Sequence, residues 1–259
     1  MFEQFISSMK TFQPSSVLPL PSNLKLAEDG KISIYYAPFD YVNSQAKIVL
    51  CGITPGLQQA ELALTEAKQQ LLAGSDIEIS KQKAKETASF GGPMRSNLIA
   101  LLDHVGVHEY LGLDSCERLF STHKHFVHYT SALRYPVFIE GLNYSGSPSM
   151  LSKTILKQQI DKYLVEEIRA LSKDCIYVPL GPKVTQVFDY LVQQGLVNSG
   201  RVLNGLPHPS GANAERISYF LGRKAKDNLS TKTNAEQIEL VRSKLMNQIN
   251  CLLKQRASV

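Results

Sequence analysis

Residues 48–56 read IVLCGITPG, an apolar run that leads directly into a proline–glycine turn. Residues 201–210 read RVLNGLPHPS and repeat this arrangement far downstream. A short continuous apolar run is typical of a parallel strand that is covered on both faces. We therefore expect two neighbouring strands, each ending in a rigid polar turn, and one site assembled from those turns.

The chain around these stretches alternates between strand and helix patterns. We expect four central strands, at residues 48–51, 126–133, 175–180 and 202–206. Helical patterns separate or follow them at residues 58–73, 76–88, 96–104, 152–171, 184–192 and 212–221. This alternation predicts a doubly wound α/β fold, with helices on both faces of a parallel sheet. The turns that follow the strands, at Pro55, Arg134, Gly181 and Pro209, should then converge on a crevice at one edge of the sheet.

The remaining segments extend this core, which covers about residues 46–222. An N-terminal extension, residues 1–45, should contain a short helix, an irregular Pro/Ser-rich stretch and an edge strand within residues 31–42. Residues 134–149 are expected to form a long loop, and residues 224–232 a polar linker. Thr233 and Glu236 have capping-box spacing for a C-terminal helix at 233–256, packed on the core. We expect one domain, residues 1–259.

Composition narrows the possible environment of the protein. The 259 residues carry a net charge of +5, which is compatible with a polyanionic partner. We expect no signal peptide, and no apolar run reaches about 20 residues, the length that a membrane span needs. The four cysteines are isolated in the sequence, which favours a reducing, cytoplasmic location.

Metal and cofactor sites are not indicated by the sequence. His123, His125 and His128 straddle the start of an expected strand, so they would not share one face as metal ligands do. The turn at residues 52–56 matches neither a dinucleotide-binding glycine pattern nor a phosphate loop. We therefore expect no metal and no cofactor.

The turn around His208 has more than one interpretation. Pro207 and Pro209 fix the backbone on either side of this histidine, which could act chemically or could only cap the next helix. Ser210 could cap that helix or present its hydroxyl to a phosphate. A serine nucleophile is disfavoured, because Ser210 lies two residues from His208 and outside a nucleophile elbow.

Four motifs, taken in order, resemble those of the uracil-DNA glycosylase superfamily. Residues 52–56 (GITPG) resemble its first motif and residues 208–213 (HPSGAN) its second. Residues 89–93 (SFGGP) are similar to the loop whose phenylalanine stacks on the flipped base. Residues 178–182 (VPLGP) are similar to the strand and turn that hold a DNA phosphate. The resemblance covers roughly residues 46–222 and implies a three-layer α/β/α sandwich around a four-stranded parallel sheet.

The resemblance also implies an activity: flipping of a nucleotide and hydrolysis of its N-glycosidic bond, as in DNA repair by base excision. His208 would stabilise the leaving base, and Thr54 would help to place the water. The resemblance assigns base binding to Ile53, Phe90 and Thr130. It assigns phosphate binding to Gly181, Ser147 and Ser210, and the wedge position to Ala212.

Three of these positions depart from the family pattern. Thr54 stands where several branches carry Asp or Asn, and a hydroxyl is no general base at neutral pH. Thr130 lies near the position of the asparagine that reads uracil, and Ala212 is small for a wedge. DNA, single- or double-stranded, is the expected partner. The alternatives are a nucleic-acid-binding member without activity and a hydrolase of a small nucleoside-like metabolite.

Overall fold

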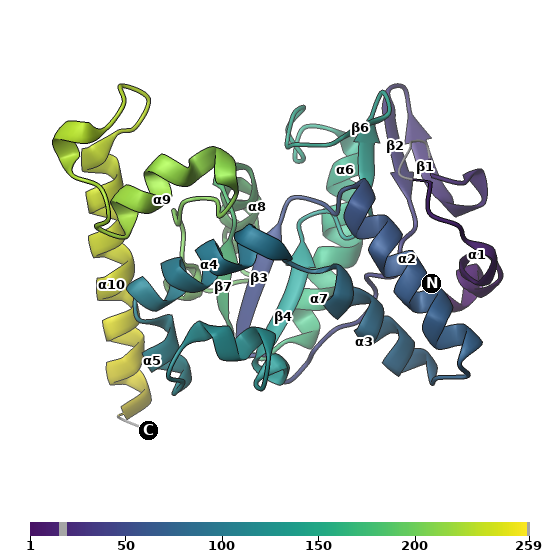
Figure 1. Ribbon diagram of the computed structural model, residues 1–259, viewed down its shortest axis with the longest axis horizontal. Helices are drawn as coiled ribbons and strands as arrows, with labels where there is room; N and C mark the ends of the chain where they lie inside the picture. Colours follow the sequence, from purple (N-terminus) through teal and green to yellow (C-terminus); the bar gives the residue numbers. More distant parts are fainter. Residues whose placement is uncertain (16–19, 258–259) are drawn as a thin grey trace. The chain divides into compact units, whose positions relative to one another are not determined.

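The computed structural model describes residues 1–15 and 20–257 (Figure 1). The chain falls into two compact units. Unit 1 comprises Met1–Ser44, Cys51–Ser89 and Tyr129–Leu171. Unit 2 comprises Gln45–Leu50, Phe90–His128 and Ser172–Val259. Residues 16–19, part of the expected Pro/Ser-rich stretch, lie outside the described residues. The expectation of one domain stays a prediction.

A three-stranded parallel sheet confirms three of the four expected central strands. Its order is β4–β3–β7, with β3 at Ile48–Gly52, β4 at Val127–Ser131 and β7 at Ile176–Pro179. The prediction of a fourth strand at residues 202–206 is wrong. Within the described part of this segment, only Val202 forms a parallel bridge, to Tyr177. The chain leaves strand geometry soon afterwards, because Gly205 has a φ of +104°.

An antiparallel sheet in unit 1 corrects a second expectation. Its order is β1–β2–β5–β6, with strands Lys25–Asp29, Ile32–Tyr35, Val137–Ile139 and Leu142–Asn143. The segment 134–149, expected as a loop, thus contains a hairpin. Its turn is Glu140-Gly141, where both φ angles are positive, as tight hairpin turns require. β2 pairs with β1 and β5, so it is not the edge strand that we expected.

The helices of unit 1 follow the expected pattern closely. α2 and α3 pack against each other, as Figure 1 shows, and Asp76 caps α3 by accepting from the Glu78 amide at 2.8 Å. The long helical pattern at 152–171 is one helical segment with a π-helical turn at its centre. The elements are a 3-10 turn (Phe2–Phe5), α1 (Ile6–Thr11), a 3-10 turn (Ser22–Leu24), α2 (Leu57–Leu72), α3 (Ile77–Ala88), α6 (Thr154–Gln159), the π turn (Ile160–Leu164) and α7 (Val165–Ala170).

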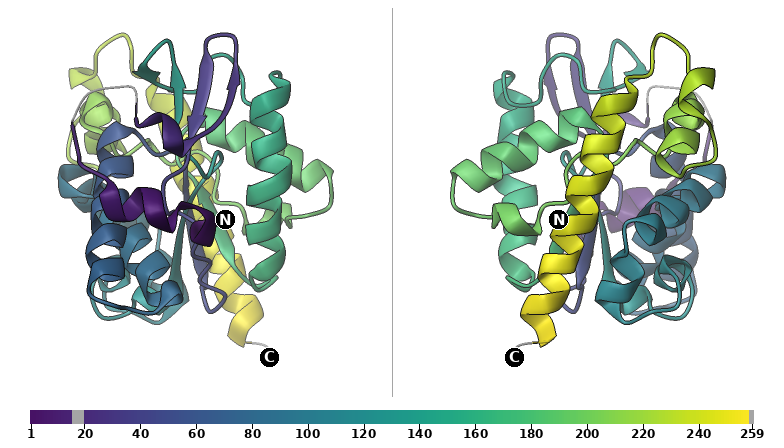
Figure 2. Two further views of the ribbon diagram at one scale, coloured as in Figure 1. Left: turned by 90° about the vertical axis from the view of Figure 1, so that its right-hand side faces the viewer. Right: turned by 90° about the vertical axis from the view of Figure 1, so that its left-hand side faces the viewer.

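Two helices of unit 2 differ from expectation: α5 (Val107–Leu111) was not expected, and α4 begins earlier than expected. α4 begins at Gly92 rather than Ser96, because a proline is well tolerated in the first turn of a helix. α4 and α8 lie on opposite faces of β7 (Figure 2). The helices are α4 (Gly92–His104), α5 (Val107–Leu111), α8 (Pro182–Gln193), α9 (Ala214–Phe220) and α10 (Ala235–Ala257). Short 3-10 turns occur at Cys116–Phe120, Lys124–Phe126, Ser199–Arg201, Gly211–Asn213 and Lys226–Asn228.

The C-terminal helix α10 packs on unit 2 beside α9 and α5. It buries Leu245, Ile249 and Leu252, as its apolar spacing predicts. The expected capping box is wrong. The side chain of Asn234 accepts from the Gln237 amide at 3.0 Å, whereas the Thr233 hydroxyl donates to Glu215.

A group of buried charged side chains in unit 1 has no signature in the sequence. Glu167 accepts hydrogen bonds at 2.5 Å from both Arg134 Nε and the Thr130 hydroxyl. Lys85 Nζ lies 3.8 Å from the same carboxylate and donates to the Tyr41 carbonyl at 2.7 Å. Burial lowers the pKa of Lys85 to about 8, although Glu167 acts in the opposite direction. One buried anion therefore compensates two buried cations.

We expect Glu167→Gln to destabilise the protein more than Lys85→Met. The first leaves two buried cations without a counter-ion and should cost about 3–5 kcal/mol of unfolding free energy. The second leaves a neutral Arg134–Glu167 pair and removes the donor to Tyr41, which should cost on the order of 1–2 kcal/mol. Urea unfolding at pH 7 measures both values, and an equal or reversed order would contradict this account.

Candidate functional site

The His208 turn in unit 2 is restrained from two sides. Asn97 of α4 donates from Nδ2 to the Pro209 carbonyl at 2.9 Å. On the other side, a Cβ added to Gly181 would lie 3.5 Å from His208 Cδ2, and Gly181 has a φ of +93°. The glycine thus permits both the sharp β7–α8 turn and the close approach of the imidazole. As expected, the structure brings the Gly181 and His208 turns together.

One hydrogen bond identifies the tautomer of His208. The Ser210 backbone N–H donates to His208 Nδ1 at 3.3 Å, so Nδ1 carries the lone pair. Burial lowers the pKa of His208 below its usual value, which favours the neutral ring. The proton of a neutral ring then lies on Nε2, which has no acceptor among the described residues. The turn therefore presents a neutral N–H donor.

This donor lies beside a groove of about 820 Å³ within unit 2. His208 and Gly181 line the groove together with residues of α8, α9 and α10. The cations Arg216, Lys232 and Lys244 also line it. The groove is therefore a place where an anionic ligand could meet the His208 donor.

Phe90, also in unit 2, adopts an unusual backbone conformation. Its φ is +48°, in the left-handed region that bulky residues seldom occupy. Arg95 Nε donates to the Phe90 carbonyl at 2.7 Å, and its guanidinium lies 5.1 Å from the centre of the Phe120 ring. Strained backbone of this kind concentrates at ligand sites, which makes Phe90 a candidate contact residue.

Ser210 and Ala212 follow His208 at the start of a 3-10 turn. Ser210 makes no capping hydrogen bond, although its Oγ accepts from Asn213 Nδ2 at 3.4 Å. The capping interpretation of Ser210 is therefore wrong. Ala212 is exposed.

Thr54 in unit 1 uses its hydroxyl to join two turns. The hydroxyl donates to the Tyr135 carbonyl at 3.0 Å and accepts from the Val137 amide at 3.2 Å. The Ile53 carbonyl accepts from the Leu133 amide at 2.9 Å. The turns at Pro55 and Arg134 are thus brought together, as expected, although Arg134 leads into β5 and not into a helix. One lone pair of the Thr54 hydroxyl stays available for a water.

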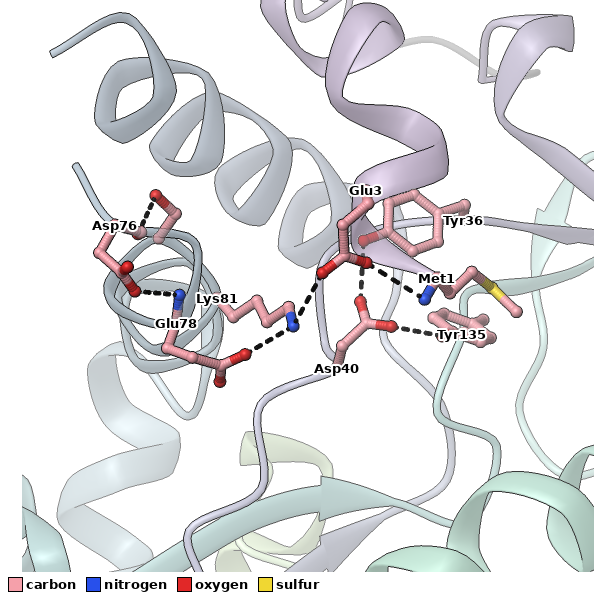
Figure 3. A network of polar contacts seen from close by, with 9 residues as sticks. Met1, Glu3, Tyr36, Asp40, Asp76, Glu78, Lys81 and Tyr135 are labelled. Carbon is pink, nitrogen blue, oxygen red and sulfur yellow. Dashed lines mark hydrogen bonds and ion pairs between the residues drawn. The ribbon is translucent and has the colours of Figure 1, made fainter. Parts of the chain in front are cut away.

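The carboxylate of Asp40 was not singled out by the sequence, because no motif surrounds it. Asp40 accepts from the Tyr36 and Tyr135 hydroxyls, each at 2.8 Å (Figure 3). Tyr135 connects this carboxylate to Thr54 through its backbone. Burial, followed by the nearby Asp40 charge, raises the pKa of both phenols. Both tyrosines therefore stay protonated and act as hydrogen-bond donors.

Two other expected site residues lie in unit 1. Thr130 is buried and its hydroxyl is held by Glu167, whereas Ser147 is exposed. No group of three metal-binding side chains occurs among residues 1–15 and 20–257. Within the same residues, no helix has the length and apolar character to cross a membrane.

A comparison with known proteins finds a relative in Bacillus subtilis (strain 168), the uncharacterized protein YoxB. It is 35% identical to this chain over 214 residues, which is 81% of this chain and 84% of YoxB. No family model matches the chain, and neither does any solved structure.

We expect the Nε2–H tautomer of His208 to be visible by NMR. Its imidazole should titrate below pH 6.5, because burial disfavours the charged ring. A ¹⁵N–¹H long-range spectrum at pH 7.5 should show a protonated Nε2 and an unprotonated Nδ1, assigned with a His208→Gln variant. A protonated Nδ1 or a pKa above 6.5 would contradict the geometry.

Proposed function

The chain belongs to the same family as YoxB, and for this chain we propose a DNA glycosylase-like function on a uracil-DNA glycosylase-like fold. The observation that carries the proposal is the neutral His208 ring. Its Nδ1 is occupied by the Ser210 amide, and its Nε2–H is free to donate beside a cationic groove. Such a donor suits a reaction in which negative charge develops on a leaving group.

The proposed reaction is hydrolysis of the N-glycosidic bond of uracil or another damaged base. The bond between the sugar C1′ and the base nitrogen breaks, and the base leaves with the electron pair. His208 donates a hydrogen bond from Nε2 to the oxygen on which the negative charge accumulates. Water adds to C1′ and loses a proton to the solvent, and the departing base anion takes up a proton from the solvent, so atoms and charges balance.

The other residues have supporting roles in this proposal. Phe90 stacks on the flipped base, a contact worth about 1–3 kcal/mol. Thr54 accepts a hydrogen bond from the water through its remaining lone pair. Gly181, Ser147 and Ser210 contact phosphates.

A nucleic-acid-binding role without catalysis is the second candidate. The observation that favours it is the hydrogen bond from the Thr54 hydroxyl to the Tyr135 carbonyl. A hydroxyl in this position cannot act as a base towards the water. A hydrolase of a small nucleoside-like metabolite would use the same donor, but it would not need three cations along a groove.

We expect His208→Ala to abolish excision. Removing one well-placed oxyanion donor typically costs about 10²–10³ in rate. The assay incubates single- and double-stranded oligonucleotides carrying uracil, hypoxanthine or a mismatch, then reveals abasic sites by alkaline cleavage on a gel. His125→Ala, which removes an exposed histidine away from the groove, should retain full activity.

Each alternative outcome has a defined meaning. Full activity of His208→Ala would reject the mechanism. Oligonucleotide binding without abasic product from any substrate would favour the binding role.

A further inference from the structure

The charged side chains that line the groove beside His208 are all cationic. Arg216, Lys232 and Lys244 line it, whereas no carboxylate does. Two of the acidic residues that neighbour the lining in sequence are engaged elsewhere, and Glu236, beside Gln237, does not line the groove. Glu215 pairs with Lys224 at 2.7 Å, and Glu239 accepts from the Tyr219 hydroxyl. The groove therefore favours an anionic occupant.

Arg216 is held in place before any ligand binds. Its Nη1 donates to Asn213 Oδ1 at 3.0 Å, and its Nη2 donates to the Lys232 carbonyl at 3.2 Å. A guanidinium has five N–H donors, so further donors are left for a ligand. Because the planar group is already oriented, little entropy is lost when it binds a phosphate.

α10 forms one wall of this groove. Its lining residues recur at helical spacing and so share one face: Gln237, Ile238, Leu240, Val241 and Lys244. The wall lies close to the strand-end loop, because a Cβ at Gly205 would come within 2.8 Å of Val241 Cγ1. Gly205 thus permits the close contact that places the α10 face beside His208.

The lining between the cations is apolar. Leu206, Ile238 and Val241 contribute to it, and Leu240 is 65% exposed. In a duplex, the faces of the bases are stacked on one another, and only the base edges, the sugars and the phosphates are presented. A single strand presents both phosphates and unstacked bases, which suit a charged rim and an apolar floor.

One residue of the groove, Asn204, has a buried side-chain oxygen. Asn204 Oδ1 has no hydrogen-bond partner among the described residues. Buried polar atoms are normally hydrogen-bonded, so this amide has capacity for a ligand. A base bears such donors and acceptors on its edges.

From these features we propose that the groove binds a segment of single-stranded nucleic acid adjacent to the nucleotide held at His208. The assignment rests on the proposed function for the position of that nucleotide. The phosphates contact Arg216, Lys232 and Lys244, and the bases lie on the apolar face of α10. Single-stranded nucleic acid is then the substrate class.

The first test removes charge from the groove. Lys232→Gln/Lys244→Gln is compared with Lys10→Gln/Lys173→Gln, which removes two exposed lysines outside the groove. Both pairs are made in a His208→Ala background, so that turnover does not disturb binding. Fluorescence anisotropy measures the affinity for a labelled single-stranded oligonucleotide of about 15 nucleotides and for its duplex over a range of salt concentrations.

We expect the groove pair to weaken single-strand binding on the order of tenfold at low salt. The slope of log K against log salt should fall by about 1.4, since each single-strand phosphate contact contributes about 0.7. The control pair should change neither value by as much. Equal effects of the two pairs, or duplex binding as tight as single-strand binding, would overturn the proposal.

The second test uses the absence of tryptophan from the sequence. Leu240→Trp places a single fluorophore on the groove face, and Leu72→Trp places one at a site of matched exposure in unit 1 (65% and 64%). An unlabelled single strand should quench the first fluorophore by stacking and leave the second unchanged. Equal quenching at both sites, or none at position 240, would overturn the proposal.

Failure of the groove assignment and failure of the proposed function are distinguishable. If no substrate yields abasic sites but both tests succeed, the excision activity fails and the groove assignment stands. If the wild-type protein excises bases but the groove pair binds normally, the groove assignment fails and the activity stands.

Discussion

The hydrogen bond from the Ser210 amide to His208 Nδ1 determines the chemistry available in unit 2. It depends on a backbone that Pro207 and Pro209 restrict and that Asn97 holds from α4. Because the bond occupies Nδ1, and because burial disfavours the charged ring, only Nε2 can donate. A looser turn would release Nδ1, mix the tautomers and lose the directed donor. The two prolines and the contact from α4 therefore have chemical as well as structural consequences.

Side chains of α10 hold several backbone carbonyls of unit 2. Gln248 donates to the carbonyls of Gly200 and Val202, and Arg242 donates to the Phe220 carbonyl. Of these carbonyls, that of Val202 belongs to the segment that was expected as the fourth strand. Residues 202–206 are thus held by a helix and one bridge instead of a full strand ladder. The irregular backbone leaves Asn204 and Gly205 free to line the groove.

The sequence predicted the elements whose signals are local. Continuous apolar runs identified β3 and β7, helix-forming composition identified α2 and α3, and helical spacing identified the segment 152–171 and α10. The β5–β6 hairpin was missed because the run of turn-forming residues at 144–149 suggested one long loop. Lys85 and Glu167 were missed because buried charges look like exposed ones in a helical pattern; only tertiary packing reveals the partner that each one has. For the site, adjacency in the chain placed Ser210 beside His208, whereas the contribution of α10 to the groove depends on how distant segments pack.

The Thr54 turn and the His208 turn differ in the catalytic groups that they offer, and this difference bears on the proposed reaction. The Thr54 hydroxyl donates a hydrogen bond to the Tyr135 carbonyl, and a hydroxyl is no general base at neutral pH, so unit 1 offers a group that can orient a water but cannot deprotonate it. If the glycosidic bond breaks before water attacks, the sugar is cationic when the water arrives, and a strong base is not needed. The barrier then depends mainly on stabilising the departing base, which is the task of a neutral N–H donor. The neutral donor at His208 and the limited capacity of Thr54 are therefore each consistent with the proposed reaction, if that reaction is dissociative.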